Sequence, residues 1–262
     1  MPTPSWREES VTVAGVNVHL YRGGEGPPLV LLHGGEVNPG WLQHHQALAE
    51  EFTVYAPSHP GFGHTPGLPW IASIADMALF YLWFLDAIGL SRVHLVGHDI
   101  GGWLAADIAT ATPQVVDRLV LVDAMGIKPQ RGEIYDIFLA TPATVRSKSF
   151  FDPQQVPEWQ QLYGNPPGPQ GTDRAEEALE TSVRLCWKPF MHEPRLPFLL
   201  PRVKQPTLVV WGREDAITPL ECGELYRQAI RGARIHVIEH CGHCPQIEKP
   251  QAFAEVVRSF LR

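Results

Sequence analysis

The chain has 262 residues, of which 44% are hydrophobic and 19% charged, the proportions of an ordinary globular protein with one large core. A formal net charge of −7, without any run of like charges, argues against a nucleic-acid surface, which needs clustered lysines and arginines. No apolar run reaches the length of a membrane span and the four cysteines are few, so we expect a cytoplasmic protein without a membrane segment.

Short apolar runs predict the strands of the first half of the chain, at residues 10–13, 16–21, 28–32, 53–56, 92–96 and 118–122. The first two flank the turn residues Ala14 and Gly15, a pattern that predicts an antiparallel hairpin at a sheet edge. Apolar residues at helical spacing lie between the later strands, at residues 41–50, 74–88 and from 101 onward.

The pattern changes after Met125. Residues 126–203 contain many prolines and a helix-like stretch at 175–185, but no clear buried strand, so we interpret them as an inserted helical cap. Strands and helices then alternate again, at residues 207–211, 220–230, 234–238 and 251–261. This order predicts an α/β core domain of residues 1–125 and 204–262, with a mostly parallel sheet covered by helices on both faces.

The most informative stretch is residues 92–109, where a short strand turns sharply into an alanine-rich helix. Gly97 and Gly101 lie two residues before and two after Asp99, so Asp99 is at the apex of the turn. Small residues at these positions, which let strand and helix approach each other, are typical of a nucleophile elbow. The apex of that motif is ordinarily serine, and here it is aspartate.

Polar loops follow several other strands. They contain the HGGE sequence at residues 33–36, Asp215 in WGREDAITP and His243 in HCGHCPQIEKP. With these loops in this order, the chain resembles the α/β-hydrolase superfamily from about residue 10 to its end. The resemblance implies an eight-stranded, mostly parallel sheet, and the triad order of nucleophile, acid and histidine falls on Asp99, Asp215 and His243.

The role of each residue follows from its chemistry. His243 needs a carboxylate to hold the correct tautomer, and Asp215 is the best placed; Asp123, which also ends a strand, is the alternative. The backbone N–H groups of Gly35 and Ile100 are the expected oxyanion hole. Glu36, Trp103, Tyr135 and Tyr163 are the candidate residues of an apolar substrate pocket.

An aspartate at the apex changes the expected reaction. It is ionised at neutral pH and suits attack on a saturated carbon, forming an alkyl ester that water activated by His243 then hydrolyses. In this respect the chain resembles epoxide hydrolases and dehalogenases, and Tyr135 and Tyr163 match the tyrosines that open an epoxide. It departs from them at Gly35 and Glu36, where they usually have a proline in the loop.

The dehalogenase resemblance has further gaps. Haloalkane dehalogenases usually place a tryptophan directly after the nucleophile to hold the halide, and Ile100 has no such donor. Fluoroacetate-type dehalogenases carry arginines where this chain has Ile100 and Trp103. Both dehalogenase interpretations are weakened by these gaps. The expected substrate is a small apolar molecule of the epoxide or alkyl-halide type.

Other interpretations stay open. The chain is also compatible with an ester, lactone or carbon–carbon bond hydrolase in which Asp99 replaces the nucleophilic serine, or with a binding protein that has lost turnover. Asp99 could instead cap the helix that follows it. We expect no cofactor and no metal, because the glycines at 97–102 lack dinucleotide-binding spacing and the histidines lack metal-ligand spacing. We expect a monomer or homodimer that acts on a small molecule.

Overall fold

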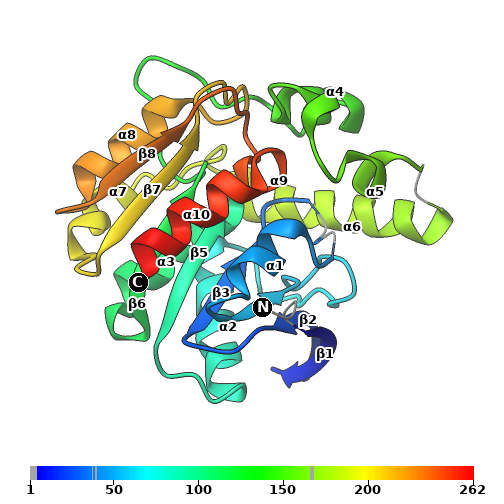
Figure 1. Cartoon of the computed structure of the whole chain (residues 1–262), viewed down its shortest axis with the longest axis vertical. Helices are drawn as coiled ribbons and strands as arrows, with labels where there is room; N and C mark the ends of the chain where they lie inside the picture. The colour runs from blue at the N-terminus through cyan, green and yellow to red at the C-terminus, as the bar shows by residue number, and fades with distance from the viewer. Residues whose placement is uncertain (1–4, 37, 39, 166–167) are drawn as a thin grey trace.

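A computed structural model of the protein describes residues 5–36, 38, 40–165 and 168–262. Within these residues, one sheet has the strand order β1-β2-β4-β3-β5-β6-β7-β8 (Figure 1). The strands are β1 (Trp6–Val13), β2 (Val16–Gly23), β3 (Pro28–Leu32), β4 (Thr53–Pro57), β5 (Val93–His98), β6 (Val116–Val122), β7 (Thr207–Gly212) and β8 (Arg234–Ile238).

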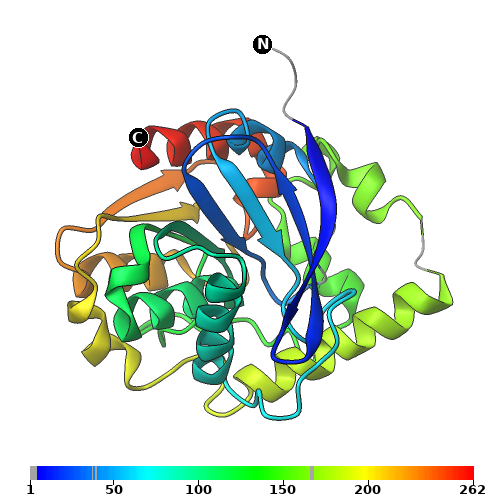
Figure 2. The ribbon, with the colours of Figure 1, turned by 90° about the horizontal axis from the view of Figure 1, so that it is seen from below.

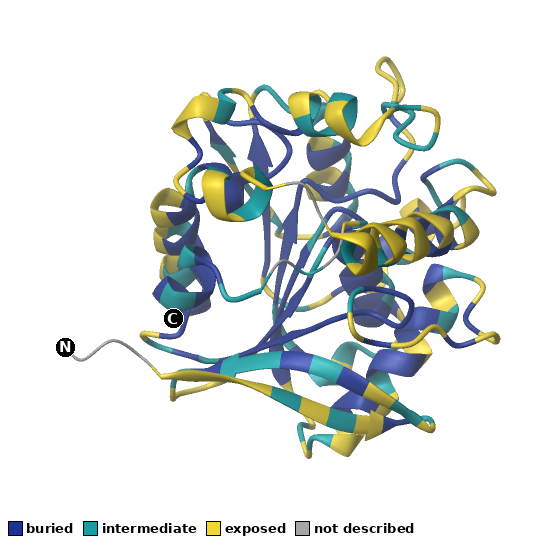
Figure 3. Cartoon of the chain, turned by 90° about the vertical axis from the view of Figure 1, so that its right-hand side faces the viewer, coloured by how far each residue is buried: buried dark blue, intermediate teal, exposed yellow. Residues whose placement is uncertain are grey.

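The sheet is parallel except at one edge. β1 pairs with β2 in an antiparallel hairpin, and β2 is antiparallel to β4. Each later pair of neighbours is parallel. The predictions of a mostly parallel eight-stranded sheet and of an edge hairpin are confirmed, with hairpin strands longer than predicted. The central strands have continuous apolar sequences because they are buried, whereas the edge hairpin, which exposes many of its residues, has a more polar sequence (Figure 3).

Helices cover both faces of the sheet (Figures 1 and 2). Side chains of α2, α3 and α8 pack into one apolar cluster, and those of α1 and α10 pack into the cluster on the opposite face. Among the described residues, no helix combines the length and the apolar character that crossing a bilayer demands. The bounds are α1 (Gln43–Leu48), α2 (Ile74–Ala87), α3 (Ile100–Ala111), α8 (Leu220–Ala229), α9 (Pro245–Glu248) and α10 (Pro250–Leu261).

The connection between β6 and β7 is helical. It contains α4 (Pro142–Ser149), α5 (Trp159–Tyr163), α6 (Pro169–Cys186) and α7 (Leu196–Leu199). Its described residues add no strand to the sheet and form only an isolated bridge between Gly126 and His192. Figure 1 shows α4, α5 and α6 grouped to one side of the sheet. We refer to residues 123–206 as the β6–β7 segment.

The junction between β5 and α3 is tightly packed. A Cβ atom added at Gly97, in β5, would lie only 2.1 Å from the backbone oxygen of Gly101, in the first turn of α3. Since both partners are backbone, no side chain can move aside to relieve such a contact. The close approach of strand and helix at this turn therefore requires glycine.

We predict that Gly97→Ala lowers the free energy of unfolding by about 1–3 kcal/mol, because the new methyl group overpacks a backbone contact. Gly168→Ala is the matched control, since a Cβ atom at Gly168 meets nothing within 4 Å, and its effect should stay within about 0.5 kcal/mol. Urea denaturation of both variants measures the difference. Equal stabilities would show that the junction tolerates a side chain.

Candidate active site

Asp99 occupies the strained apex of the turn between β5 and α3. Its backbone has φ 55° and ψ −120°, a left-handed conformation that non-glycine residues adopt rarely. Backbone hydrogen bonds hold this conformation: Asp99 N–H donates to Val122 O over 3.0 Å, and Gly102 N–H donates to Asp99 O over 3.0 Å. The side chain makes no capping hydrogen bond to α3, so the interpretation of Asp99 as a helix cap is wrong.

The two carboxylate oxygens of Asp99 have different surroundings. Oδ2 accepts a hydrogen bond from the backbone N–H of Gly35 over 2.8 Å. Oδ1 is buried and accepts no hydrogen bond from the described residues. The neighbouring loop residue must be small, because a Cβ atom at Gly34 would lie 2.7 Å from Oδ2. One oxygen is thus fixed by the loop after β3, whereas the other lacks a hydrogen-bond donor among the described residues.

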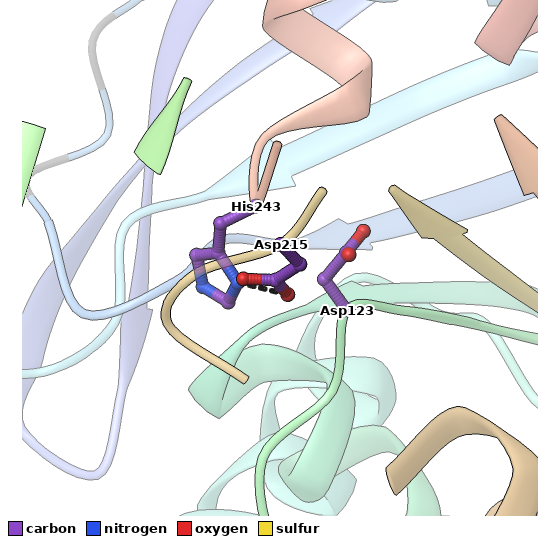
Figure 4. A group of neighbouring side chains, drawn as sticks. All are labelled: Asp123, Asp215 and His243. Carbon is purple, nitrogen blue, oxygen red and sulfur yellow. Dashed lines mark hydrogen bonds and ion pairs between the residues drawn. The ribbon is translucent and has the colours of Figure 1, made fainter. Parts of the chain in front are cut away.

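His243 connects Asp99 to a second carboxylate. Its Nδ1 hydrogen-bonds Oδ2 of Asp215 over 2.8 Å, as Figure 4 shows, and its Nε2 lies 3.6 Å from Oδ1 of Asp99. Asp215 is itself held by the turn after β7, because its Oδ1 accepts from the N–H groups of Ile217 and Thr218 at 2.8 and 3.0 Å. The structure therefore brings together the three residues predicted as a triad.

The charges of Asp99 and His243 support each other. Burial lowers the pKa of His243, but the charges of Asp215 and Asp99 and the hydrogen bond to Asp215 outweigh burial, and the pKa lies well above its ordinary value. Burial likewise raises the pKa of Asp99, yet His243 and the N–H of Gly35 outweigh it and hold this pKa below its ordinary value. At neutral pH the pair is therefore a carboxylate beside an imidazolium.

Asp123 lies beside the triad without contacting His243 through a hydrogen bond. Its Oδ1 accepts from Gly212 N–H over 2.9 Å, and its Oδ2 is buried without a hydrogen-bond partner among the described residues. One side-chain atom each from Asp123, Asp215 and His243 lie within 4.8 Å of one another (Figure 4). Of the two predicted candidates for the acid, Asp215 is the one that bonds the imidazole.

Two other histidines hold the loops around Asp99. His33 Nδ1 contacts the backbone oxygen of Gly34 at 2.7 Å, and His98 Nε2 contacts that of His243 at 2.8 Å. Burial lowers the pKa of both imidazoles, that of His98 to about 4, so each is neutral at pH 7. They act as fixed hydrogen-bonding groups, His33 in the loop after β3 and His98 at the end of β5.

Asp99 and His243 line a cavity of about 650 Å³. Of the predicted pocket residues, Glu36 and Tyr163 also line it. Trp103 and Tyr135 do not, so the structure does not support them as pocket residues. The ring of Trp103 packs against Gly126, within the helix layer, and Tyr135 hydrogen-bonds the loop after β7 through its backbone. Helical spacing from Asp99 alone did not determine which side of α3 faces the cavity.

Several cavity residues were not predicted from the sequence. Arg146, from α4, lines the cavity with its guanidinium 4.3 Å from the centre of the Tyr163 ring, and its Nε is buried without a partner among the described residues. Ser182, from α6, donates to the backbone oxygen of Gly35 over 3.3 Å. Neither residue belongs to a motif, because the β6–β7 segment has no repeated strand pattern to place its side chains.

Glu36 is a second acidic residue of this cavity, beside Asp99. The residue as a whole is exposed, but the protein atoms packed around its carboxyl raise its pKa; Arg146 opposes the shift, whereas the charge of Asp99 adds to it. The Tyr163 hydroxyl lowers the pKa of the Glu36 carboxyl, whereas burial and Glu36 raise the pKa of Tyr163. Ile100, the other predicted oxyanion donor, is the first residue of α3, where N–H groups lack acceptors within the helix.

The chain is similar to known proteins in sequence and in fold. The sequence pattern of the alpha/beta hydrolase family matches residues 29–256. The 2-hydroxy-6-oxo-2,4-heptadienoate hydrolase of Pseudomonas putida is 28% identical over 96% of this chain and 95% of its own. A 2-hydroxymuconate semialdehyde hydrolase of Pseudomonas putida is 29% identical over 96% and 92%. The solved structure of a serine hydrolase involved in carbazole degradation has a TM-score of 0.81 and 25% identity, over 98% of this chain and 99% of its own.

We predict that Asp99→Asn lowers the pKa of His243 by about 1–3 units, because the variant removes an opposite charge within ion-pair distance of the imidazole. NMR titration of labelled histidines measures this pKa, with His243→Gln identifying the signal. Asp107 lies in α3, the helix that follows Asp99, and Asp107→Asn should leave the titration of His243 unchanged. A His243 pKa that is equal in Asp99→Asn and the parent protein would show that the two charges do not interact.

Proposed function

Because the chain belongs to the alpha/beta hydrolase family, we propose that it is a hydrolase whose nucleophile is the carboxylate of Asp99. The reaction attacks a saturated carbon of a small, largely apolar molecule. It forms an alkyl ester on Asp99, and water activated by His243 hydrolyses that ester. We further propose that residues 126–203 form a cap over a core of residues 1–125 and 204–262.

The observation that carries this proposal is the different environment of the two Asp99 oxygens. Gly35 N–H holds Oδ2, whereas Oδ1 accepts no hydrogen bond from the described residues and Asp99 lines the cavity. After Oδ1 has formed a bond to carbon, Oδ2 becomes the carbonyl oxygen of the ester. That oxygen already lies at the donor that stabilises negative charge when water attacks.

In the first step, Oδ1 forms a bond to the substrate carbon as the bond to the leaving group breaks. The leaving group departs with the electron pair, as a halide or as an epoxide oxygen that takes up a proton. Asp99 needs no base for this step, because His243 and Gly35 hold its pKa below the ordinary value. The imidazolium of His243 is 3.6 Å from Oδ1 and keeps the nucleophile ionised until it reacts.

In the second step, the protonation state of His243 has to change. Esterification removes the negative charge of Asp99, one of the groups that raise the pKa of His243. The imidazolium then loses its proton to solvent more readily and serves as the base, while Asp215 keeps its orientation. His243 takes one proton from water and the water oxygen bonds to the Asp99 carbonyl carbon. The ester carbon–oxygen bond then breaks, and the second water proton passes to the departing alkoxide, so that an alcohol leaves and the Asp99 carboxylate is regenerated.

The cavity favours an epoxide over an alkyl halide. Tyr163 lines the cavity together with Glu36, and its hydroxyl can give a proton to the epoxide oxygen as the ring opens. A halide instead needs N–H donors such as an indole. Trp103 does not line the cavity and Ile100 has no side-chain donor, so the residues that hold a halide are lacking at these two positions.

A second candidate function rests on the relatives. Their names describe hydrolases of dienoates and semialdehydes, and one is a serine hydrolase, so Asp99 could replace the serine of such an enzyme. The position of Oδ2 opposes this interpretation. It occupies the N–H of Gly35, where the oxyanion of an acyl substrate would bind. If neither candidate shows turnover, the third interpretation, a binding protein, is favoured.

We predict that His243→Gln accumulates an alkyl adduct on Asp99 when it is mixed with an epoxide, because attack proceeds and hydrolysis does not. Intact-protein mass spectrometry after a single turnover measures the added mass, and peptide mapping places it. A panel of epoxides, alkyl halides and activated esters makes the assay independent of one substrate.

The controls separate the candidate functions. His243→Gln combined with Asp99→Asn should give no adduct with any compound. If no adduct forms in His243→Gln, yet Asp99→Ser hydrolyses esters that the parent protein does not, the chain is a serine-hydrolase scaffold with a replaced nucleophile. The absence of adducts and of turnover in every variant would favour the binding protein.

We predict that Tyr163→Phe slows adduct formation from epoxides by about 10²–10⁴-fold and leaves alkylation by halides unchanged, because only the epoxide oxygen needs a proton. The rate is read by mass spectrometry in the His243→Gln background. Tyr135→Phe is the matched control and should change neither rate, since Tyr135 does not line the cavity. If epoxides react equally fast with and without the Tyr163→Phe substitution, this tyrosine is not the acid.

A further inference from the structure

Asp123 is a fully buried carboxyl group that the reaction above does not use. It follows β6 directly, in a left-handed backbone conformation with φ 42°, and its side chain reaches the end of β7. There Oδ1 accepts from Gly212 N–H over 2.9 Å. Oδ2 has no hydrogen-bond donor of its own among the described residues, and the carboxyl lies within 4.8 Å of atoms of Asp215 and His243 (Figure 4).

If Asp123 and Asp215 were both ionised, their carboxylates would repel each other, and the surrounding hydrogen-bond donors among the described residues are too few for both. Asp215 accepts from three donors, the N–H groups of Ile217 and Thr218 and the Nδ1 of His243. Asp123 accepts from one. The negative charge of the pair is therefore best accommodated on Asp215, and a single proton on Asp123 removes both the repulsion and the unpaired oxygen.

We propose that Asp123 is a positioning residue that keeps a proton on Oδ2 and presents it to the Asp215 carboxylate, as a neutral donor behind the triad. Asp215 is then held by donors on each side, with His243 at the front. This role differs from the acid role considered above, in which Asp123 would be ionised and would bind His243 directly. It is also independent of whether Asp99 attacks an epoxide, a halide or an ester.

The groups around Asp123 agree with a neutral carboxyl. Burial and the charge of Asp215 raise its pKa well above the ordinary value, against the opposing effect of His243. From the loop after β8, the thiols of Cys241 and Cys244 also face this region, and burial raises the pKa of both, so they are neutral. No lysine or arginine of the described residues forms an ion pair with Asp123.

A neutral Asp123 tunes the basicity of His243. As a donor to Asp215 it draws electron density from that carboxylate, which then holds the imidazolium less tightly. An ionised Asp123 would have the opposite effect, because a second negative charge stabilises the imidazolium. The two possibilities therefore predict different results for Asp123→Asn, which removes the charge but keeps a donor: the His243 pKa is unchanged if Asp123 is neutral and falls if Asp123 is ionised.

Infrared difference spectroscopy detects the proton directly. At pH 8 the parent protein minus Asp123→Asn should show a carbonyl band of a protonated carboxyl group. Asp107, whose pKa is about 6, is ionised at this pH and does not contribute. The absence of the band would overturn the proposal. A chelator should leave it unchanged; a band that appears only after chelation would mean that a bound cation had taken the place of the proton.

NMR titration of His243 tests the effect on the triad. Asp123→Asn keeps a neutral donor, so the His243 pKa should stay as in the parent protein. Asp123→Ala removes the donor to Asp215 and should raise it. A lower His243 pKa in Asp123→Asn would show that Asp123 is ionised and would overturn the proposal. Asparagine keeps the shape of the side chain and its hydrogen bonds. If the His243 pKa changes in Asp123→Ala but not in Asp123→Asn, the change comes from the lost donor.

Discussion

The site depends on keeping a negative charge on a carboxylate that the protein has removed from water. Burial raises the pKa of Asp99, and the imidazolium of His243, together with the N–H of Gly35, outweighs that effect. These two contacts divide the carboxylate into an anchored oxygen and a free one. The left-handed turn at Asp99 is the backbone cost of placing its second carboxylate oxygen 3.6 Å from Nε2 of His243.

The parallel sheet makes these contacts possible, because neighbouring parallel strands end at the same edge. Gly35, Asp99, Asp123, Asp215 and His243 each lie shortly after the end of a different strand, β3, β5, β6, β7 and β8. Residues far apart in the chain therefore meet without long side chains. The order of charges at this edge alternates: carboxylate, imidazolium, carboxylate and a neutral carboxyl. This alternation limits repulsion among groups that all lie within a few ångströms.

Much of this arrangement could be predicted because it is encoded locally. The glycines around Asp99, the Ala14-Gly15 turn and the helical spacing at 74–88 each act over a few residues, and their elements formed where predicted. The triad was predictable because its members follow strands. The wall of the cavity was not: Trp103 and Tyr135 were expected there, whereas Arg146 and Ser182 are found. These side chains are oriented by packing between helices of the β6–β7 segment, which has no regular pattern.

By itself, the sequence determined the α/β class, the eight strands and the three residues that the structure brings together around His243, because periodicity and turn glycines act between near neighbours. The tertiary structure decided between the two candidate acids, because Asp123 and Asp215 both lie shortly after a strand and only Asp215 hydrogen-bonds His243. It also decided that Oδ2 of Asp99 meets Gly35 and Oδ1 meets His243. Such choices depend on hydrogen bonds between distant segments, and the spacing of residues along the chain carries no information about them.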